Sequence, residues 1–200
     1  MQLEAYLDDL ASARPTPGGG SAATIVGALA AALVAMVARI TRESPRHAAV
    51  AERASALVAR AEELRAQLTS NRVADELAFE AVIAALALPK TTDEEKVERT
   101  ARLQHALAGA ASVPLHSAEL ARDVMALALE ALELGNRHLA SDAGCAAEFA
   151  AAAVRSAAYN VRANHPTLKD AELVAKQKAK LAALQSEADD LLAKARFLSS

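Results

Sequence analysis

A carboxylate and an amide lie in register with a long apolar helical pattern in the middle of the chain. Asp75 and Asn71 are four residues apart, and they continue a series in steps of four and three that comprises Leu57, Ala61, Leu64 and Leu68. This spacing places them on one helix face, which the apolar series predicts to point inward. A buried carboxylate is costly unless it is paired or used, so Asp75 is a candidate for proton transfer. Alternatively, the helix ends near residues 69–71 and Asp75 is exposed or caps the next element.

A second candidate site is the segment 15–21, which reads Pro-Thr-Pro-Gly-Gly-Gly-Ser and precedes an uncharged apolar run. Pro15 and Pro17 stiffen the approach, and Gly18, Gly19 and Gly20 let a ligand come close to the backbone. Ser21 is expected to cap the following helix, so free N–H groups would face the loop and hold an anion or a polar ring. No strand-like run precedes the glycines and no lysine follows them, which excludes a dinucleotide fingerprint and a P-loop. A flexible turn between two helices is the other interpretation.

A third group of polar residues surrounds the start of a later helix. Gly135 is a natural helix stop, with Asn136 directly after it. Ser141 is expected to cap the next helix and to place Asp142 in its first turn. Asp142 is either a second acid of the site or an ordinary complement to the helix dipole.

The same helix contains a stripe that ends in polar groups and comprises Cys145, Phe149, Ala152, Ser156 and Asn160. Ser156 can bond to a carbonyl one turn earlier, whereas Asn160 needs several partners if it is buried. Cys145 is expected to be a small core residue. Asn160 is therefore the member of the stripe that most favours a binding role.

Several function classes find no support in the sequence. The five histidines have no ligand spacing and no paired Cys/His motif occurs, so no metal is expected. A net charge of −3 gives no electrostatic basis for binding nucleic acid or an anionic membrane. The single cysteine and the absence of a signal-peptide pattern lead us to expect a cytoplasmic protein without disulfides.

The elements that must position these residues are all helical, and we expect one domain over residues 1–200. Hydrophobic residues, mostly Ala, Leu and Val, form 53% of the chain and aromatic residues only 2%, which favours closely packed helices. Helix 21–41 is apolar on every side, so we expect burial all round, within the domain or at a subunit interface. Thr92 and Glu95 predict a capping box, and Pro114 should kink or break the helix that it opens. The remaining helices are expected over residues 3–10, 46–88, 115–134, 141–164 and from 169 onward.

Taken together, the motifs resemble the cyclodeaminase/cyclohydrolase family that acts on tetrahydrofolate. The resemblance follows the chain from the segment 15–23 through Asp75 and Phe79 to the run Leu88-Pro89-Lys90-Thr91-Thr92. It continues through residues 113–115 and 135–144 and closes on residues 156–161. The chain departs from the family pattern in three places. Val73 and Ala74 stand where a second acid often precedes the equivalent of Asp75, and residues 42–46 differ from the Gly and basic residues that often follow Thr41. Thr91 replaces the asparagine of a Pro-Lys-Asn-Thr pattern.

The resemblance implies an all-α, up-and-down helical bundle that forms a homodimer, takes a folate substrate and needs neither metal nor cofactor. It implies a catalytic role for Asp75, with Asn71 orienting water or the ring and Asp142 as a second acid or a partner of the pterin. It places Lys90 opposite the glutamate tail of the folate. The other residues that it implies for substrate binding are Pro17, Gly18, Gly19, Gly20, Ser21, Asn136, Ser141 and Asn160.

Three functions remain open at this point. No formiminotransferase domain is recognised in the sequence, which favours hydrolysis of 5,10-methenyltetrahydrofolate to the 10-formyl compound. The first alternative is a formiminotetrahydrofolate cyclodeaminase, which closes the same one-carbon bridge and releases ammonia. The second is a helical dimer that binds folate without turnover.

Overall fold

The computed structural model describes residues 2–199, and these form helices without any strand. The α-helices are α1 (Leu3–Leu10), α2 (Gly19–Glu43), α3 (Ala51–Ala87), α4 (Asp93–Glu133), α5 (Ala140–Asn164) and α6 (Ala171–Ser199). Short 3₁₀ turns occupy Pro45–Val50, Arg137–Leu139 and His165–Thr167. The predicted all-α, up-and-down bundle is confirmed.

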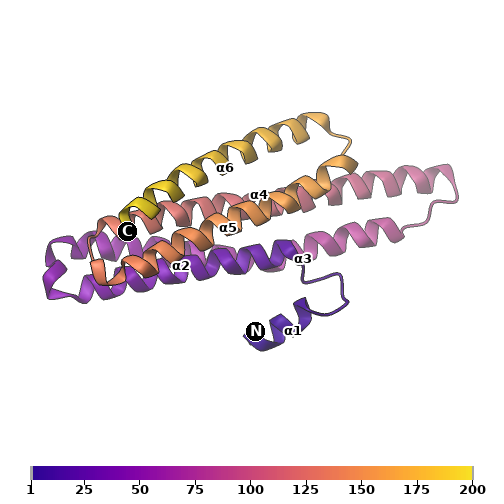
Figure 1. The fold of residues 1–200 in the computed structure, drawn as a ribbon. Helices are drawn as coiled ribbons and strands as arrows, with labels where there is room; N and C mark the ends of the chain where they lie inside the picture. The colour runs from indigo at the N-terminus through magenta and orange to yellow at the C-terminus, as the bar shows by residue number, and fades with distance from the viewer. Residues whose placement is uncertain (1, 200) are drawn as a thin grey trace.

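Four long helices make the bundle, and the other two are attached to it (Figure 1). Each of α2, α3, α4 and α5 packs against the next, and α2 also packs against α5, which closes the ring. The α6 helix lies along α4 and α5, and α1 projects from the bundle at the end of a loop. Beyond the start of α2, α3 and α4 continue together as a hairpin (Figure 1).

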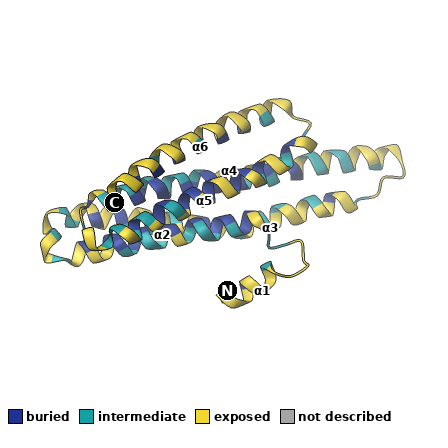
Figure 2. Ribbon diagram, viewed as in Figure 1, coloured by how far each residue is buried: buried dark blue, intermediate teal, exposed yellow. Residues whose placement is uncertain are grey.

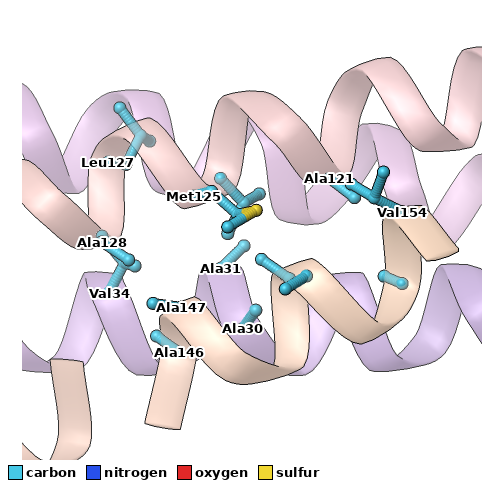
Figure 3. Close-up of a cluster of buried hydrophobic side chains, with 14 of the residues drawn as sticks. Ala30, Ala31, Val34, Ala121, Met125, Leu127, Ala128, Ala146, Ala147 and Val154 are labelled. Carbon is cyan, nitrogen blue, oxygen red and sulfur yellow. The ribbon is translucent and has the colours of Figure 1, made fainter. Parts of the chain in front are cut away.

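Small side chains let the helices of the bundle approach one another closely. Figure 3 shows Met125 of α4 surrounded by alanines and valines of its neighbours, which include Ala30, Ala31, Val34, Ala146, Ala147 and Val154. These residues are buried, and interiors packed at this density tolerate little change in volume. Figure 2 shows that burial is greatest where α2, α4 and α5 lie together and declines along the α3–α4 hairpin.

Within a single chain the α2 helix is not buried on every side, so the predicted burial all round requires the subunit interface that was the second part of that prediction. Leu29 remains 53% exposed and Ile40 46% exposed, because α3, α4 and α5 together cover only one side of the helix. Among the described helices, α2 alone is long and apolar enough to cross a membrane, and 56% of its most apolar window is buried inside the bundle. Its outer surface is therefore apolar and uncovered in a single chain.

Pro114 does not break its helix, so the two helices predicted around it are one, α4. A proline inside a helix leaves the carbonyl four residues earlier without its N–H donor. Here that carbonyl belongs to Ala110, and the side-chain amide of Asn164 donates to it at 3.1 Å. A residue 50 positions away thus replaces the missing hydrogen bond.

Of the helix ends predicted from single residues, two are confirmed and two are wrong. The capping box of Thr92 and Glu95 forms with both of its hydrogen bonds, and Gly135 ends α4 with a φ of 80°. Ser21 and Ser141, however, do not cap helices: Gly18 precedes α2, Leu139 precedes α5, and both serines lie within the first turns. The predicted α5 stripe faces outward, since Cys145 and Phe149 are exposed and alanines on the opposite side pack inward.

Candidate active site

The carboxylate of Asp75 lies against the first turn of α2. It accepts a hydrogen bond from the backbone N–H of Ser21, so the anion expected at this helix start is the protein's own side chain. Gly20 makes the approach possible, because a Cβ built there would lie 2.5 Å from Oδ2 of Asp75 and closer still to Oδ1. The α3 helix runs unbroken through this region, which excludes the alternative of a helix end near residue 70.

Burial raises the pKa of Asp75 above the usual range of an aspartate. The hydrogen bond from Ser21 acts in the opposite direction, and the neighbouring negative charge of Glu76 raises the pKa further. A carboxyl group with a raised pKa is a better proton acceptor when ionised and a readier donor once protonated.

Asp75 forms one wall of a pocket of about 210 Å³ near the start of α2. The lining comes from the loop before α2, from the first turn of α2, and from α3, α4 and α5, and comprises Pro15, Thr16, Gly18, Gly19, Gly20, Asp75, Phe79, Ala110, Asn160 and Asn164. A concave pocket in which several segments place exposed backbone, an aromatic ring and a few polar side chains is typical of a small-molecule site.

Two asparagines give this pocket an edge of hydrogen-bond acceptors. The side-chain amide of Asn164 donates to the carbonyls of Ala110 and Asn160, and that of Asn160 donates to the carbonyl of Ser156. Among the described residues, no donor reaches either side-chain oxygen, Oδ1. With the Asp75 carboxylate, these two oxygens suit a ligand that presents N–H groups or a positive charge.

Ser21 connects the pocket to a polar network behind it. Its hydroxyl is buried, lies 2.9 Å from the hydroxyl of Tyr6, and donates to Glu76 at 2.9 Å. Arg72 donates to the same Glu76 oxygen at 2.6 Å, and its guanidinium lies 5.9 Å from the centre of the Tyr6 ring. Ser21 therefore touches Asp75 through its backbone and Glu76 through its side chain.

The structure brings together only part of the predicted site. Gly18, Gly19, Gly20, Asp75 and Asn160 line one pocket. Pro17, which follows a cis peptide bond, and Ser21 flank this pocket without being part of its lining.

Asn71 is also outside the lining and instead joins α3 to α4. Its amide donates to the carbonyl of Val113 at 3.1 Å and to the hydroxyl of Ser117 at 2.6 Å.

The other predicted residues lie elsewhere in the chain. Asn136 donates to Thr41 at the far end of α2, and Ser141 and Asp142 are in the first turn of α5 nearby. The 25 residues of α2 span roughly 37 Å at about 1.5 Å each, which separates Asp142 from Asp75 within one chain. Lys90 is exposed in the loop that joins α3 to α4, beyond the twelve residues of α3 that follow Asp75.

Sequence reasoning missed several residues around the pocket. Phe79 and Asn164 each lie four positions after a residue that had been identified, Asp75 and Asn160, so helical spacing alone would have found them. Tyr6 carried no such signal, because its partner Ser21 is 15 residues away across a loop.

A larger groove of about 690 Å³ runs between α3, α4 and α6, and it is a weaker candidate. Its basic side chains are engaged in ion pairs: Lys180 with Glu119 and Arg122 with Asp123 inside the groove, and Arg60 with Glu130 beside it. No group of three His, Cys, Asp or Glu residues within the described chain could hold a metal ion. The pocket at Asp75 is therefore the stronger candidate, because it combines a concave surface with a carboxylate whose pKa is raised.

Known proteins resemble this chain over nearly all of its length. Residues 2–183 match the family model described as Formiminotransferase-cyclodeaminase. A methenyltetrahydrofolate cyclohydrolase of Methylorubrum extorquens is 43% identical over 94% of this chain and 91% of its own length. A formimidoyltransferase-cyclodeaminase of Rattus norvegicus is 34% identical, and this chain matches 34% of that longer protein.

A solved structure agrees with the sequence relatives. The formiminotetrahydrofolate cyclodeaminase of Thermotoga maritima superposes with a TM-score of 0.89 at 30% identity, covering 99% of this chain and 95% of that one. Fold, motifs and sequence similarity thus lead to one conclusion: the chain belongs to the formiminotransferase-cyclodeaminase family.

Proposed function

We propose that this protein hydrolyses 5,10-methenyltetrahydrofolate to 10-formyltetrahydrofolate. The observation that carries the proposal is the partly buried Asp75 carboxylate at the acceptor edge formed with Asn160 and Asn164. The methenyl bridge of the substrate is a cation shared between N5 and N10, so a carboxylate and two amide oxygens are complementary to it. The 43% identity to a cyclohydrolase supports the same reaction.

The chemistry that we propose needs one group that accepts and returns a proton. Ionised Asp75 removes a proton from water as the water oxygen bonds to the methenyl carbon, which neutralises the cation. Protonated Asp75 then donates to N5 while the bond from that carbon to N5 breaks, and the new hydroxyl loses its proton as the formyl group forms on N10. The balance is one water consumed and one proton released, without a metal or a redox cofactor.

The pocket also supplies a surface for the flat ring system of a folate. The backbone of Gly18 and Gly19 is unobstructed by side chains, and Phe79 presents an aromatic face. Lys90 and Asp142 do not reach this pocket within one chain, so roles in the same site require a second copy of the protein.

The second candidate is the cyclodeaminase reaction, favoured by the structural match to the Thermotoga maritima enzyme. In that reaction N10 attacks a formimino carbon on N5 and ammonia leaves, so the same carboxylate would transfer the protons. Both substrates should be tested on one preparation. Loss of methenyl absorbance above the buffer rate supports the cyclohydrolase, whereas cyclisation of the formimino substrate with ammonia release alone establishes the alternative.

Binding of the folate without reaction of either substrate would instead identify a protein that has lost catalysis. This outcome is measured by calorimetric titration of the purified protein with the methenyl compound.

We also propose that the protein acts as a cytoplasmic homodimer whose interface is the outer face of α2 and α5. Gly19 packs beside Asn160 and Gly27 beside Ala153, so the two helices are antiparallel and their outer surfaces adjoin. The run 19–38 has no charged residue, and a face of this kind is normally covered. A second copy would cover it through the symmetric contact that homodimers use.

A further inference from the structure

The α1 helix has a single buried side chain, that of Tyr6. Leu3 and Leu7 remain 60% and 51% exposed, whereas Tyr6 is 3% exposed and is the single buried residue of this helix. Tyr6 is not part of the contiguous apolar core, and α1 stands apart from the bundle in Figure 1. Its attachment therefore serves something other than the packing of the core.

The hydrogen bonds at Tyr6 have a defined direction. The hydroxyl of Ser21 has one hydrogen, which it donates to the carboxylate of Glu76. The hydroxyl of Tyr6 must then donate to Ser21, at 2.9 Å. Arg72 compensates the charge of Glu76 and its guanidinium lies over the Tyr6 ring. The hydroxyl of Tyr6 thus contacts Ser21, and its ring contacts Arg72.

The residue that receives this hydrogen bond also holds the reactive carboxylate. Ser21 donates its backbone N–H to Asp75, one position after the glycine that admits the carboxylate. The loop that joins α1 to α2, together with the first two residues of α2, supplies half of the pocket lining, from Pro15 to Gly20. Both ends of this wall are thus fixed, one by Tyr6 and the other by the start of α2.

We propose that Tyr6 is a positioning residue for the folate pocket: it docks α1 and so fixes the wall formed by the loop from Pro15 to Gly20. The inference rests on the proposed function and assigns to α1 a role in substrate binding. Tyr6 itself lies behind Ser21 and outside the lining, so it acts through the loop and not on the substrate.

The test is Tyr6→Phe, which keeps the ring against Arg72 and removes only the donor. Loss of one such hydrogen bond should raise KM for methenyltetrahydrofolate about 2–10-fold, with kcat changed less than about twofold. Tyr6→Ala, which also removes the ring, should raise KM further. Leu7→Ala is the matched control, because it truncates an exposed residue on the same helix and should leave both constants unchanged.

Hydrogen exchange of residues 2–18 gives a readout that does not depend on turnover. A helix of eight residues is unstable by itself, so α1 should unfold and exchange faster when Tyr6→Phe weakens its docking. The melting temperature should be unchanged, because Tyr6 is outside the core.

Unchanged exchange and unchanged KM in Tyr6→Phe would overturn the proposal. A fall in kcat that follows a fall in melting temperature, with KM constant, would also overturn it and leave Tyr6 a structural residue. If the wild-type protein processes neither folate substrate, the proposed function fails, and the exchange measurement alone then decides whether Tyr6 docks α1.

Discussion

At the scale of single residues, Asp75 occupies a position that destabilises its ionised form, and we assign proton transfer to the same carboxyl group. Burial and the charge of Glu76 raise its pKa, and the N–H of Ser21 offsets only part of this effect. Functional sites often contain groups that would not be chosen for stability alone. Two predictions distinguish a catalytic role of Asp75 from a purely structural one.

We expect Asp75→Asn to lose about 10²–10⁴-fold in turnover, because an amide cannot accept the proton of water. The folded protein should not be destabilised. Asparagine can still accept from Ser21, and the substitution removes an ionised group from a site that disfavours it. Turnover and the free energy of unfolding should be measured on the same sample, and near-native turnover would remove Asp75 from the mechanism.

The pH dependence of stability provides the control. The pKa of Asp75 is raised in the folded protein, so the ionised carboxylate opposes folding at neutral pH, and this opposition disappears as pH falls through the folded pKa. Asp75→Asn should therefore be the more stable protein at neutral pH, and the difference should vanish in acid. The kcat/KM of the wild-type protein should fall over the same acidic range.

Gly20→Ala should displace the Asp75 carboxylate, because the added Cβ overlaps it, and should lower both turnover and stability. Gly109→Ala is the matched control. Gly109 lies within α4 and has no atom within 4 Å of an added Cβ, so alanine there should stabilise the helix by about 0.5–1 kcal/mol. Equal effects of the two substitutions in urea unfolding and turnover assays would contradict the close approach of Asp75.

At the scale of elements, the side chain of Asn164 repairs the interruption that Pro114 makes in α4. Asn164→Ala should cost about 1–3 kcal/mol, since it leaves the partly buried carbonyl of Ala110 without a donor. In the background of Pro114→Ala the same change should cost less, because a backbone N–H at position 114 can then serve that carbonyl. A double-mutant cycle by urea unfolding measures this coupling, and strictly additive effects would refute it.

The elements also indicate which structural features could be predicted from sequence. The capping box at Thr92 and the end of α4 at Gly135 depend on residues within four positions, and both predictions are confirmed. The break predicted at Pro114 was wrong because its remedy, Asn164, is remote in sequence. The predicted cap at Ser21 does not form, because the hydroxyl of Ser21 donates to Glu76, which is 55 residues away and so invisible to a local sequence argument.

Composition limited the prediction of helix orientation. The α5 helix is rich in alanine on several sides, so an apolar stripe through Cys145 and Phe149 was no better evidence of an inward face than the alanines opposite. The structure buries the alanines because they permit close approach to α2 and α4. In α2 apolar residues lie on all sides, so the sequence alone did not indicate which side the chain itself leaves uncovered, and that side includes Leu29.

At the scale of the whole molecule, the uncharged outer face of α2 predicts a dimer. Light scattering at micromolar concentration should give twice the chain mass of 20.8 kDa. Leu29→Glu, in the centre of this face, should produce monomers, because a charge would then be buried at the contact. Val97→Glu is the control, since Val97 is 71% exposed on the α3–α4 hairpin. A monomeric wild-type protein would contradict the prediction.

The hydrogen bond from Asn164 to Ala110 also restricts how this pocket can change over generations. The side chain of Asn164 donates to the Ala110 carbonyl that Pro114 leaves without a partner, and it also presents an oxygen to the pocket, so a substitution that removes its amide changes recognition and helix stability together. A lineage that first replaces Pro114 with a residue that has an N–H is released from this constraint and can then vary position 164. The structure thus favours one order of the two replacements: the replacement of Pro114 comes before the replacement of Asn164 that changes which ligand the pocket accepts.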